Sequence, residues 1–130
     1  MILVCYGTRP EYIKVKPLIE KMRGVIPFQI LRVSQHNDMV DGEYDHLINI
    51  SDGNNRLDSI VSSVMNCFDF NKEEVSHVLV QGDTATAYAV ALSAFHHKIP
   101  VIHLEAGMRT YDIENPYPEE FYRQWWFILE

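Results

Sequence analysis

The chain has few of the features that mark extracellular, membrane-spanning or nucleic-acid-binding proteins. Its two cysteines, Cys5 and Cys67, are spaced for neither a zinc motif nor a disulfide framework, so we expect both to be reduced packing residues. Basic residues are scarce, 11 against 18 acidic ones, and the net charge of −7 disfavours nucleic acid as a partner. No apolar run approaches the ~20 residues of a membrane-spanning helix. Because Met1 leads straight into a strand-like run without a signal-peptide pattern, we expect a cytoplasmic protein.

The composition that remains is typical of one ordinary globular domain. Apolar residues make up 47% and charged residues 22% of the 130 residues. A chain of this length can bury a core without metal or disulfide support. It contains no repeat, low-complexity tract or linker, so residues 1–130 are predicted to form a single domain.

Short β-branched runs alternate with longer segments of helical period along the chain. The predicted strands are Ile2–Tyr6, Phe28–Val33, Val78–Val80 and Val101–Leu104. The predicted helices are Pro10–Arg23, a short and weak Asn37–Tyr44, Leu57–Phe68, Thr84–His97 and one that starts at Glu119. Pro17 requires a kink or a fresh start within the first helix. The alternation predicts an α/β fold, a Rossmann-like parallel sheet with flanking helices.

Ligands of open α/β sheets bind beyond the carboxyl ends of the strands, and four loops lie there in this prediction. They are residues 7–9, 34–36, 82–84 and 105–107. The first loop offers Gly7 for close backbone approach and Arg9 as a donor to phosphate oxygens. It lacks the glycines and lysine of the common NAD and ATP motifs, so we predict no nucleotide cofactor.

Each candidate side chain at this rim also has a purely structural explanation. Asp83 could simply cap the helix that follows it. Glu105 could form an ion pair with Arg109, and Glu119 suits the start of a helix whatever its chemistry. The histidines form no metal motif, although His103 and Glu105 share one strand face, so no metal site is predicted.

Five blocks of sequence, taken together, carry a family resemblance. The blocks are Gly7-Thr8-Arg9-Pro10-Glu11 with Ile13, Lys14, Pro17 and Leu18; Ser34-Gln35-His36; Gln81-Gly82-Asp83-Thr84 with Thr86; His103-x-Glu105-Ala106-Gly107 with Arg109 and Thr110; and Pro116-x-Pro118-Glu119-Glu120 with Arg123. Their number and order over residues 1–124 make the resemblance specific. The chain resembles the amino-terminal half of the non-hydrolysing UDP-N-acetylglucosamine 2-epimerases.

The resemblance implies interconversion of UDP-N-acetylglucosamine and UDP-N-acetylmannosamine in a cleft between two Rossmann-like domains of the glycosyltransferase-B type. The implied acid/base residues are Asp83, Glu105 and Glu119. The implied substrate-binding residues are Arg9, Lys14, Gln35, His36, Arg109 and Arg123. Departure of UDP makes the proton on C2 acidic enough for a carboxylate to remove, and readdition of UDP after protonation on the other face gives the epimer.

The sequence departs from the family pattern near its end. Tyr122 stands where the family has asparagine, the text after Gln124 no longer resembles the family, and the carboxyl-terminal domain is not part of the chain. We therefore expect a truncated or split form that is a homo-oligomer or pairs with a carboxyl-terminal half. Two alternatives stay open: a non-catalytic module that pairs with a full-length relative through the helix at 57–68, and a flavodoxin-like nucleotide binder.

Overall fold

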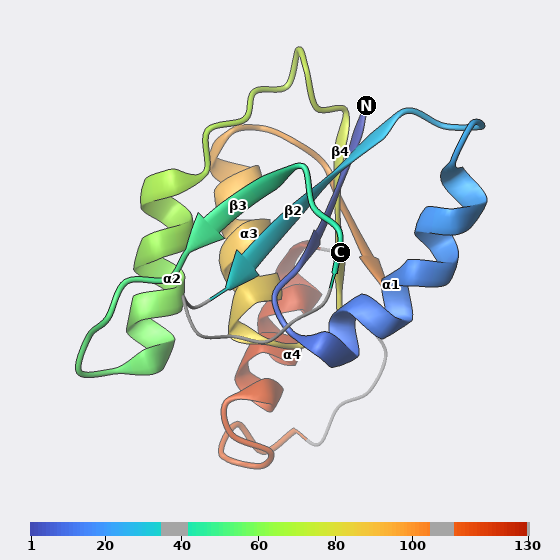
Figure 1. Cartoon of the computed structure of the whole chain (residues 1–130). Coiled ribbons are helices and arrows are strands. Elements are labelled where there is room, and N and C mark those ends of the chain that lie inside the picture. Colours follow the sequence, from blue (N-terminus) through green and yellow to red (C-terminus); the bar gives the residue numbers. More distant parts are fainter. Residues whose placement is uncertain (35–41, 105–110, 130) are drawn as a thin grey trace.

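The computed structural model of the chain describes residues 1–34, 42–104 and 111–129, and the side chains up to residue 125 within the last helix. Five strands form one sheet in the order β3-β2-β1-β4-β5 (Figure 1). The strands are β1 (Ile2–Tyr6), β2 (Phe28–Ser34), β3 (His46–Asn49), β4 (His77–Gln81) and β5 (Val101–Leu104), and every neighbouring pair is parallel. The order reverses between β1 and β4, which is where sheets of this kind open a crevice for ligands.

Four helices flank the sheet. They are α1 (Arg9–Met22), α2 (Arg56–Cys67), α3 (Ala85–His96) and α4 (Glu119–Leu129). Helices α2 and α3 pack against each other on one face of the sheet, and α1 covers the opposite face (Figure 1). Helix α4 lies against α3 and adds Tyr122 to the core on that side.

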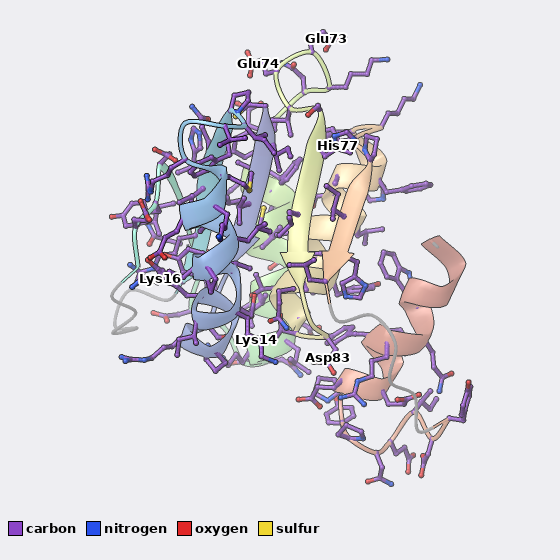
Figure 2. All side chains as sticks on the ribbon, turned by 90° about the vertical axis from the view of Figure 1, so that its right-hand side faces the viewer. Lys14, Lys16, Glu73, Glu74, His77 and Asp83 are labelled. Carbon is purple, nitrogen blue, oxygen red and sulfur yellow. The ribbon has the colours of Figure 1, made fainter. Side chains whose placement is uncertain are left out.

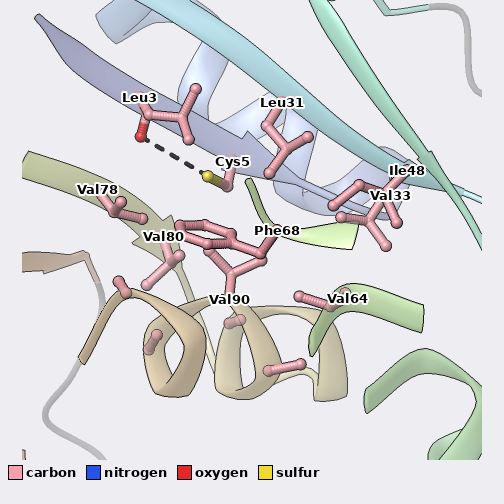
Figure 3. Close-up of a cluster of buried hydrophobic side chains, with 14 of the residues drawn as sticks. Leu3, Cys5, Leu31, Val33, Ile48, Val64, Phe68, Val78, Val80 and Val90 are labelled. Atoms are coloured by element: carbon pink, nitrogen blue, oxygen red, sulfur yellow. Dashed lines mark hydrogen bonds between the residues drawn. The ribbon is translucent and has the colours of Figure 1, made fainter. Parts of the chain in front are cut away.

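The buried side chains form two clusters, one on each face of the sheet. The larger lies between the sheet and helices α2 and α3, as Figure 3 shows for Leu3, Cys5 and Phe68. The smaller lies under α1 and includes Val4 and Tyr6. Successive residues of β1 thus serve opposite faces, which explains why this strand is apolar throughout.

Three of the helices begin with a side chain that caps the backbone. Thr8, Asn55 and Thr84 each accept a hydrogen bond from a backbone N–H in the first turn of α1, α2 and α3. Because α1 and α3 directly follow β1 and β4, their N-termini lie at the carboxyl edge of the sheet. These caps place positive helix ends at the edge where the sequence predicts the site.

The structure confirms most of the predicted elements. The predicted strands Ile2–Tyr6 and Val101–Leu104 coincide with β1 and β5, and helix α4 starts at Glu119 as expected. Helix α1 runs through Pro17 as one element, and its axis bends along its length (Figure 1). The strand order also excludes the flavodoxin-like alternative. That fold places β1 between β2 and β3, whereas here β1 lies between β2 and β4.

Three expectations are wrong. Strand β3 was not predicted, and residues 42–44 are not helical, while residues 37–41 of the expected weak helix lie outside the described residues. Cys5 is buried as expected, but Cys67 is exposed because it ends α2 on the outer side; both are free thiols. The apolar stripe of α2 packs inside against α3 and β3, so it is not a surface for pairing.

No helix within the described ranges is both long and apolar enough to cross a membrane.

Candidate functional site

A cavity of about 170 Å³ lies at the carboxyl ends of β1 and β4. Its wall combines the turn after β1, the turn after β4, the start of α2 and the start of α4. The glycine and the polar residues among its lining are Gly7, Thr8, Arg56, Asp83, Thr84, Thr86 and Glu119. The sequence predicted from topology that the turns after β1 and β4 lie at this rim, but it gave no sign that Arg56 would line the same cavity.

Two of the three predicted acid/base carboxylates meet at this cavity. Asp83 follows β4 and Glu119 begins α4, and both line it. Figure 2 shows Asp83 below the end of β4, at the opposite end of the molecule from Glu73. Glu105, the third, lies outside the described residues. Asp83 and Glu119 therefore share one cavity, and their acid/base roles stay a prediction.

The predicted substrate-binding residues have different placements. Arg9 and Lys14 are exposed on α1 and, within the described part of the chain, are not among the residues that line the cavity. Figure 2 shows Lys14 at the same end of the molecule as Asp83. Gln35, His36 and Arg109 lie outside the described residues. Arg123 contacts the site directly through Asp83.

Asp83 is held by an ion pair and not by a capping bond. The Nε of Arg123 donates to Oδ2 of Asp83. The cap of α3 is the neighbouring Thr84, whose hydroxyl accepts from the backbone N–H of Ala87 at 3.1 Å. The capping explanation for Asp83 is thus wrong.

A buried glutamate on α1 joins two of the cavity walls. Glu11 is 2% exposed, and its carboxylate accepts hydrogen bonds from the N–H of Gly7 at 3.2 Å, from the Thr8 hydroxyl at 3.0 Å and from the Thr84 hydroxyl. Burial raises the pKa of this carboxyl, and the hydrogen bonds oppose the rise. Sequence reasoning did not single out Glu11, although the Thr-x-x-Glu spacing from Thr8 is the sequence pattern of a capping box.

A second buried glutamate lies at the start of α4. Glu120 is completely buried and accepts hydrogen bonds from the N–H of Tyr111 and from the side-chain amide of Gln124, each at 3.0 Å. Its Oε1 also lies 3.7 Å from Nη1 of Arg123. Glu120 therefore connects the segment before α4 with the arginine that holds Asp83.

Two aromatic residues of α4, Tyr122 and Trp125, pack against α3. Tyr122 is 5% exposed and stacks on Tyr88 of α3, with ring centroids 4.8 Å apart. Trp125 meets the same Tyr88 ring edge-on at 4.6 Å. Burial raises the pKa of Tyr122. The Tyr122 position, where the sequence departs from the family pattern, thus serves the α3–α4 contact.

The arrangement suits an anionic ligand that carries a group for acid/base chemistry. Helix N-termini attract anions, and α2 and α3 both begin at the cavity wall. Two carboxylates in the same wall can exchange protons with a bound group. The described residues contain no group of three that could hold a metal ion. Since sites for whole ligands usually measure ~300–1,000 Å³, this cavity accommodates only part of a larger substrate.

Comparison with known proteins identifies the relatives of this chain. The family model described as UDP-N-acetylglucosamine 2-epimerase matches residues 29–126. A protein of that name from Campylobacter jejuni is 40% identical over 95% of this chain, and one from Bacillus subtilis is 37% identical over 95%. The chain spans 35% of the length of each of these two relatives.

Solved structures agree with the sequence match. The UDP-GlcNAc 2-epimerase from Neisseria meningitidis, bound to UDP-GlcNAc, superposes with a TM-score of 0.89 at 36% identity, over 99% of this chain and 38% of the relative. The enzyme from Methanocaldococcus jannaschii, in complex with UDP-GlcNAc and UDP, gives 0.75 at 30% identity, over 98% and 37%. These matches confirm the resemblance to an amino-terminal half and the glycosyltransferase-B type of fold. The chain belongs to the UDP-N-acetylglucosamine 2-epimerase family.

Proposed function

We propose that this chain contributes the amino-terminal half of a UDP-N-acetylglucosamine 2-epimerase, which interconverts UDP-N-acetylglucosamine and UDP-N-acetylmannosamine. The observation that carries the proposal is the meeting of Asp83 and Glu119 in one cavity at the carboxyl ends of β1 and β4. The relative from Neisseria meningitidis, whose solved structure holds UDP-GlcNAc, supports the substrate class.

In the proposed reaction the carboxylates of Asp83, Glu105 and Glu119 handle protons. Once UDP departs, the positive charge that develops on the sugar makes the C2 proton acidic, and a carboxylate removes it to give a 2-acetamidoglucal. Return of a proton to the opposite face, followed by readdition of UDP, gives the epimer. Negative charge in the cavity wall favours the cationic transition state.

The basic side chains of the rim have the complementary task. We assign the departing diphosphate to Arg9, Lys14 and Arg109, with polar contacts from Gln35 and His36. Guanidinium and ammonium groups stabilise the growing charge on the leaving group. The exposure of Arg9 and Lys14 suits residues that face a ligand outside the 170 Å³ cavity and not within it.

The remaining contacts are proposed to come from a second unit. The chain spans 35–38% of the relatives described above, and its cavity holds only part of a nucleotide sugar. Exposed apolar side chains lie along the rim segment and α4, namely Tyr111, Ile113, Tyr117 and Phe121. Several exposed apolar side chains within one stretch of the chain favour pairing, with a carboxyl-terminal half or with a second copy. Light scattering of the purified chain tests the second option, and a monomer at high concentration rules out the homo-oligomer.

The proposed location is the cytoplasm. Both cysteines are free thiols, and the cytoplasm keeps thiols reduced.

The decisive experiment measures exchange at C2. The chain is incubated with UDP-N-acetylglucosamine in heavy water, and deuterium at C2 of the sugar is measured by NMR. We expect slow exchange in the unaltered chain and a loss of ~100-fold or more in Asp83→Asn and Glu119→Gln, since acid/base groups commonly contribute ~10²–10⁴-fold. Glu73→Gln, at the opposite end of the molecule (Figure 2), is the matched control and should exchange like the unaltered chain.

Binding measured beside exchange separates the catalytic and non-catalytic possibilities. Calorimetry with UDP-N-acetylglucosamine reports whether the chain holds the nucleotide sugar at all. Binding without exchange would favour a non-catalytic nucleotide-sugar-binding or regulatory module. The proposed function would be overturned if the chain at high concentration showed no binding and no exchange.

A further inference from the structure

Arg123 lies between two carboxylates, and this placement sets it apart from the exposed basic residues of the rim. Its Nε donates to Oδ2 of Asp83, and its Nη1 lies 3.7 Å from Oε1 of Glu120. The Arg123 side chain is 22% exposed, the Asp83 side chain is 25% exposed and the Glu120 side chain is fully shielded from water. An ion pair shielded in this way is weakened less by salt and water than one on the surface.

The charges around Arg123 argue against a diphosphate as its partner. The guanidinium already faces the carboxylates of Asp83 and Glu120, and both would repel an incoming anion. A diphosphate bound by Arg123 would also have to compete with Asp83 for the guanidinium. The exposed Arg9 and Lys14 lie outside this group.

The contacts of Glu120 explain how Arg123 is kept in place. The fully buried carboxylate is anchored by the N–H of Tyr111 and by the amide of Gln124, each at 3.0 Å. It presents its other oxygen toward Arg123, three positions further along α4. An anchored carboxylate on the same helix limits the orientations open to the guanidinium.

We propose that Arg123 and Glu120 are positioning residues for the reaction, in which Glu120 orients Arg123 and Arg123 holds the carboxylate of Asp83 against the cavity. This assignment rests on the proposed function, because it gives Asp83 its role. It replaces the substrate-binding role that the family resemblance implied for Arg123. It also gives α4 a task at the site beyond carrying Glu119.

The first test uses the ligand-free chain and needs no activity. The Nε–H groups of arginines give resolved NMR signals, and an Nε–H bonded to a carboxylate exchanges slowly with water. We expect a slowly exchanging Arg123 signal that is lost in Asp83→Asn and exchanges at least tenfold faster in Glu120→Gln. An Arg123 signal that exchanges equally fast in the unaltered chain and in both variants would overturn the proposal.

The second test separates positioning from substrate binding. Arg123→Gln should bind UDP with the affinity of the unaltered chain within about twofold, whereas Arg9→Gln should bind it at least tenfold more weakly. C2 exchange should fall ~10–100-fold in Arg123→Gln and in Glu120→Gln, the scale expected for a misplaced catalytic group. Arg123→Lys should recover part of the exchange, since an ammonium can still meet Asp83. Lys72→Gln is the matched control, because Lys72 is exposed and is the sequence neighbour of Glu73, which lies at the opposite end of the molecule from Asp83 (Figure 2).

The outcomes keep the two proposals apart. A tenfold loss of UDP affinity in Arg123→Gln would show that Arg123 binds the diphosphate, and it would overturn the positioning role. If the unaltered chain neither binds UDP nor exchanges C2, the proposed function fails, while the Arg123 signal still decides whether Glu120 and Asp83 hold the arginine. Circular dichroism of each variant shows that a change does not arise from unfolding.

Discussion

The hydroxyl of Thr84 donates a hydrogen bond to the buried carboxylate of Glu11, and this bond joins the turn after β4 to the turn after β1. Glu11 also accepts from Gly7 and Thr8, so one side chain fixes the backbone on both sides of the point where the strand order reverses. Asp83 is the residue before Thr84. The distance between Asp83 and Arg9 therefore depends on Glu11, which is bonded to their neighbours Thr84 and Thr8.

Glu11 should make the stability of the chain depend on pH. Burial raises its pKa above the ordinary 4.5, so the folded chain keeps a proton that the unfolded chain has already lost. The stability contributed by this proton is complete below about pH 4.5 and declines as the pH rises through the folded-state pKa. In urea unfolding, the unaltered chain should exceed Glu11→Gln by the largest margin near pH 4, and the margin should narrow toward neutral pH. Glu20→Gln, exposed on the same helix, should leave the pH profile unchanged. A margin that widened with rising pH would contradict this prediction.

Gly7 is required by close packing against α3. A β-carbon at this position would lie 2.6 Å from Oγ1 and 2.9 Å from Cγ2 of Thr86, and that β-branched side chain cannot swing away. Gly7→Ala should therefore reduce the free energy of unfolding by about 1–3 kcal/mol. Gly7→Ala combined with Thr86→Ala should lose less than the sum of the two single variants, because the second change makes room for the first. Additive losses in chemical denaturation would show that the clash is relieved elsewhere.

Sequence patterns predicted the elements whose burial is regular. Strands β1 and β5 consist of residues that pack on both faces of the sheet, and the stripe of α2 repeats with the helical period, so composition and period were sufficient. Strand β3 escaped because it is a four-residue edge strand in which only Ile48 is buried. A short edge strand has no apolar run, since half of its surroundings are water.

The rim of the site was predictable, but its internal contacts were not. Parallel strands end at a common edge, so the motifs around Asp83 and Gly7 had to lie near each other. The ion pair between Asp83 and Arg123 joins residues 40 positions apart, and it depends on how α4 packs against α3. No local sequence pattern predicts this packing. The sequence therefore led us to predict that Arg123 binds the substrate, and not that it pairs with Asp83.

The two thiols should differ in reactivity because they differ in burial. Cys5 lies inside the larger core cluster, and burial raises the pKa of its thiol, so the reactive thiolate is suppressed. Cys67 is exposed at the end of α2. Iodoacetamide at pH 8 should therefore label only Cys67 in the folded chain and both cysteines in urea, as mass spectrometry of the digested chain would show. Rapid labelling of Cys5 under native conditions would be inconsistent with the packing described. Cys67→Ser should remove native labelling without a change in stability, since its side chain has little to lose on the surface.

Tyr122 should hold α4 onto the rest of the molecule. Its ring stacks on Tyr88, and Trp125 packs against the same ring, so one aromatic cluster joins α3 to α4. Tyr122→Ala removes a side chain that is 5% exposed and should reduce the free energy of unfolding by about 3 kcal/mol. Tyr122→Phe keeps the stacked ring and should cost less than about 1 kcal/mol, which makes it the matched control.

The two tryptophans make the seating of α4 directly measurable. Trp125 and Trp126 are the only tryptophans of the chain, and both belong to α4. Their fluorescence reports this helix, while circular dichroism reports the whole fold. In the unaltered chain the two signals should change together on urea unfolding. In Tyr122→Ala the fluorescence should change at a lower urea concentration than the dichroism, because α4 detaches first. Since Arg123 lies on the same helix, its slowly exchanging Nε–H signal should disappear at the urea concentration at which the tryptophan fluorescence changes. If the fluorescence changed while the Arg123 Nε–H still exchanged slowly, the ion pair to Asp83 would not depend on the packing of α4 against α3.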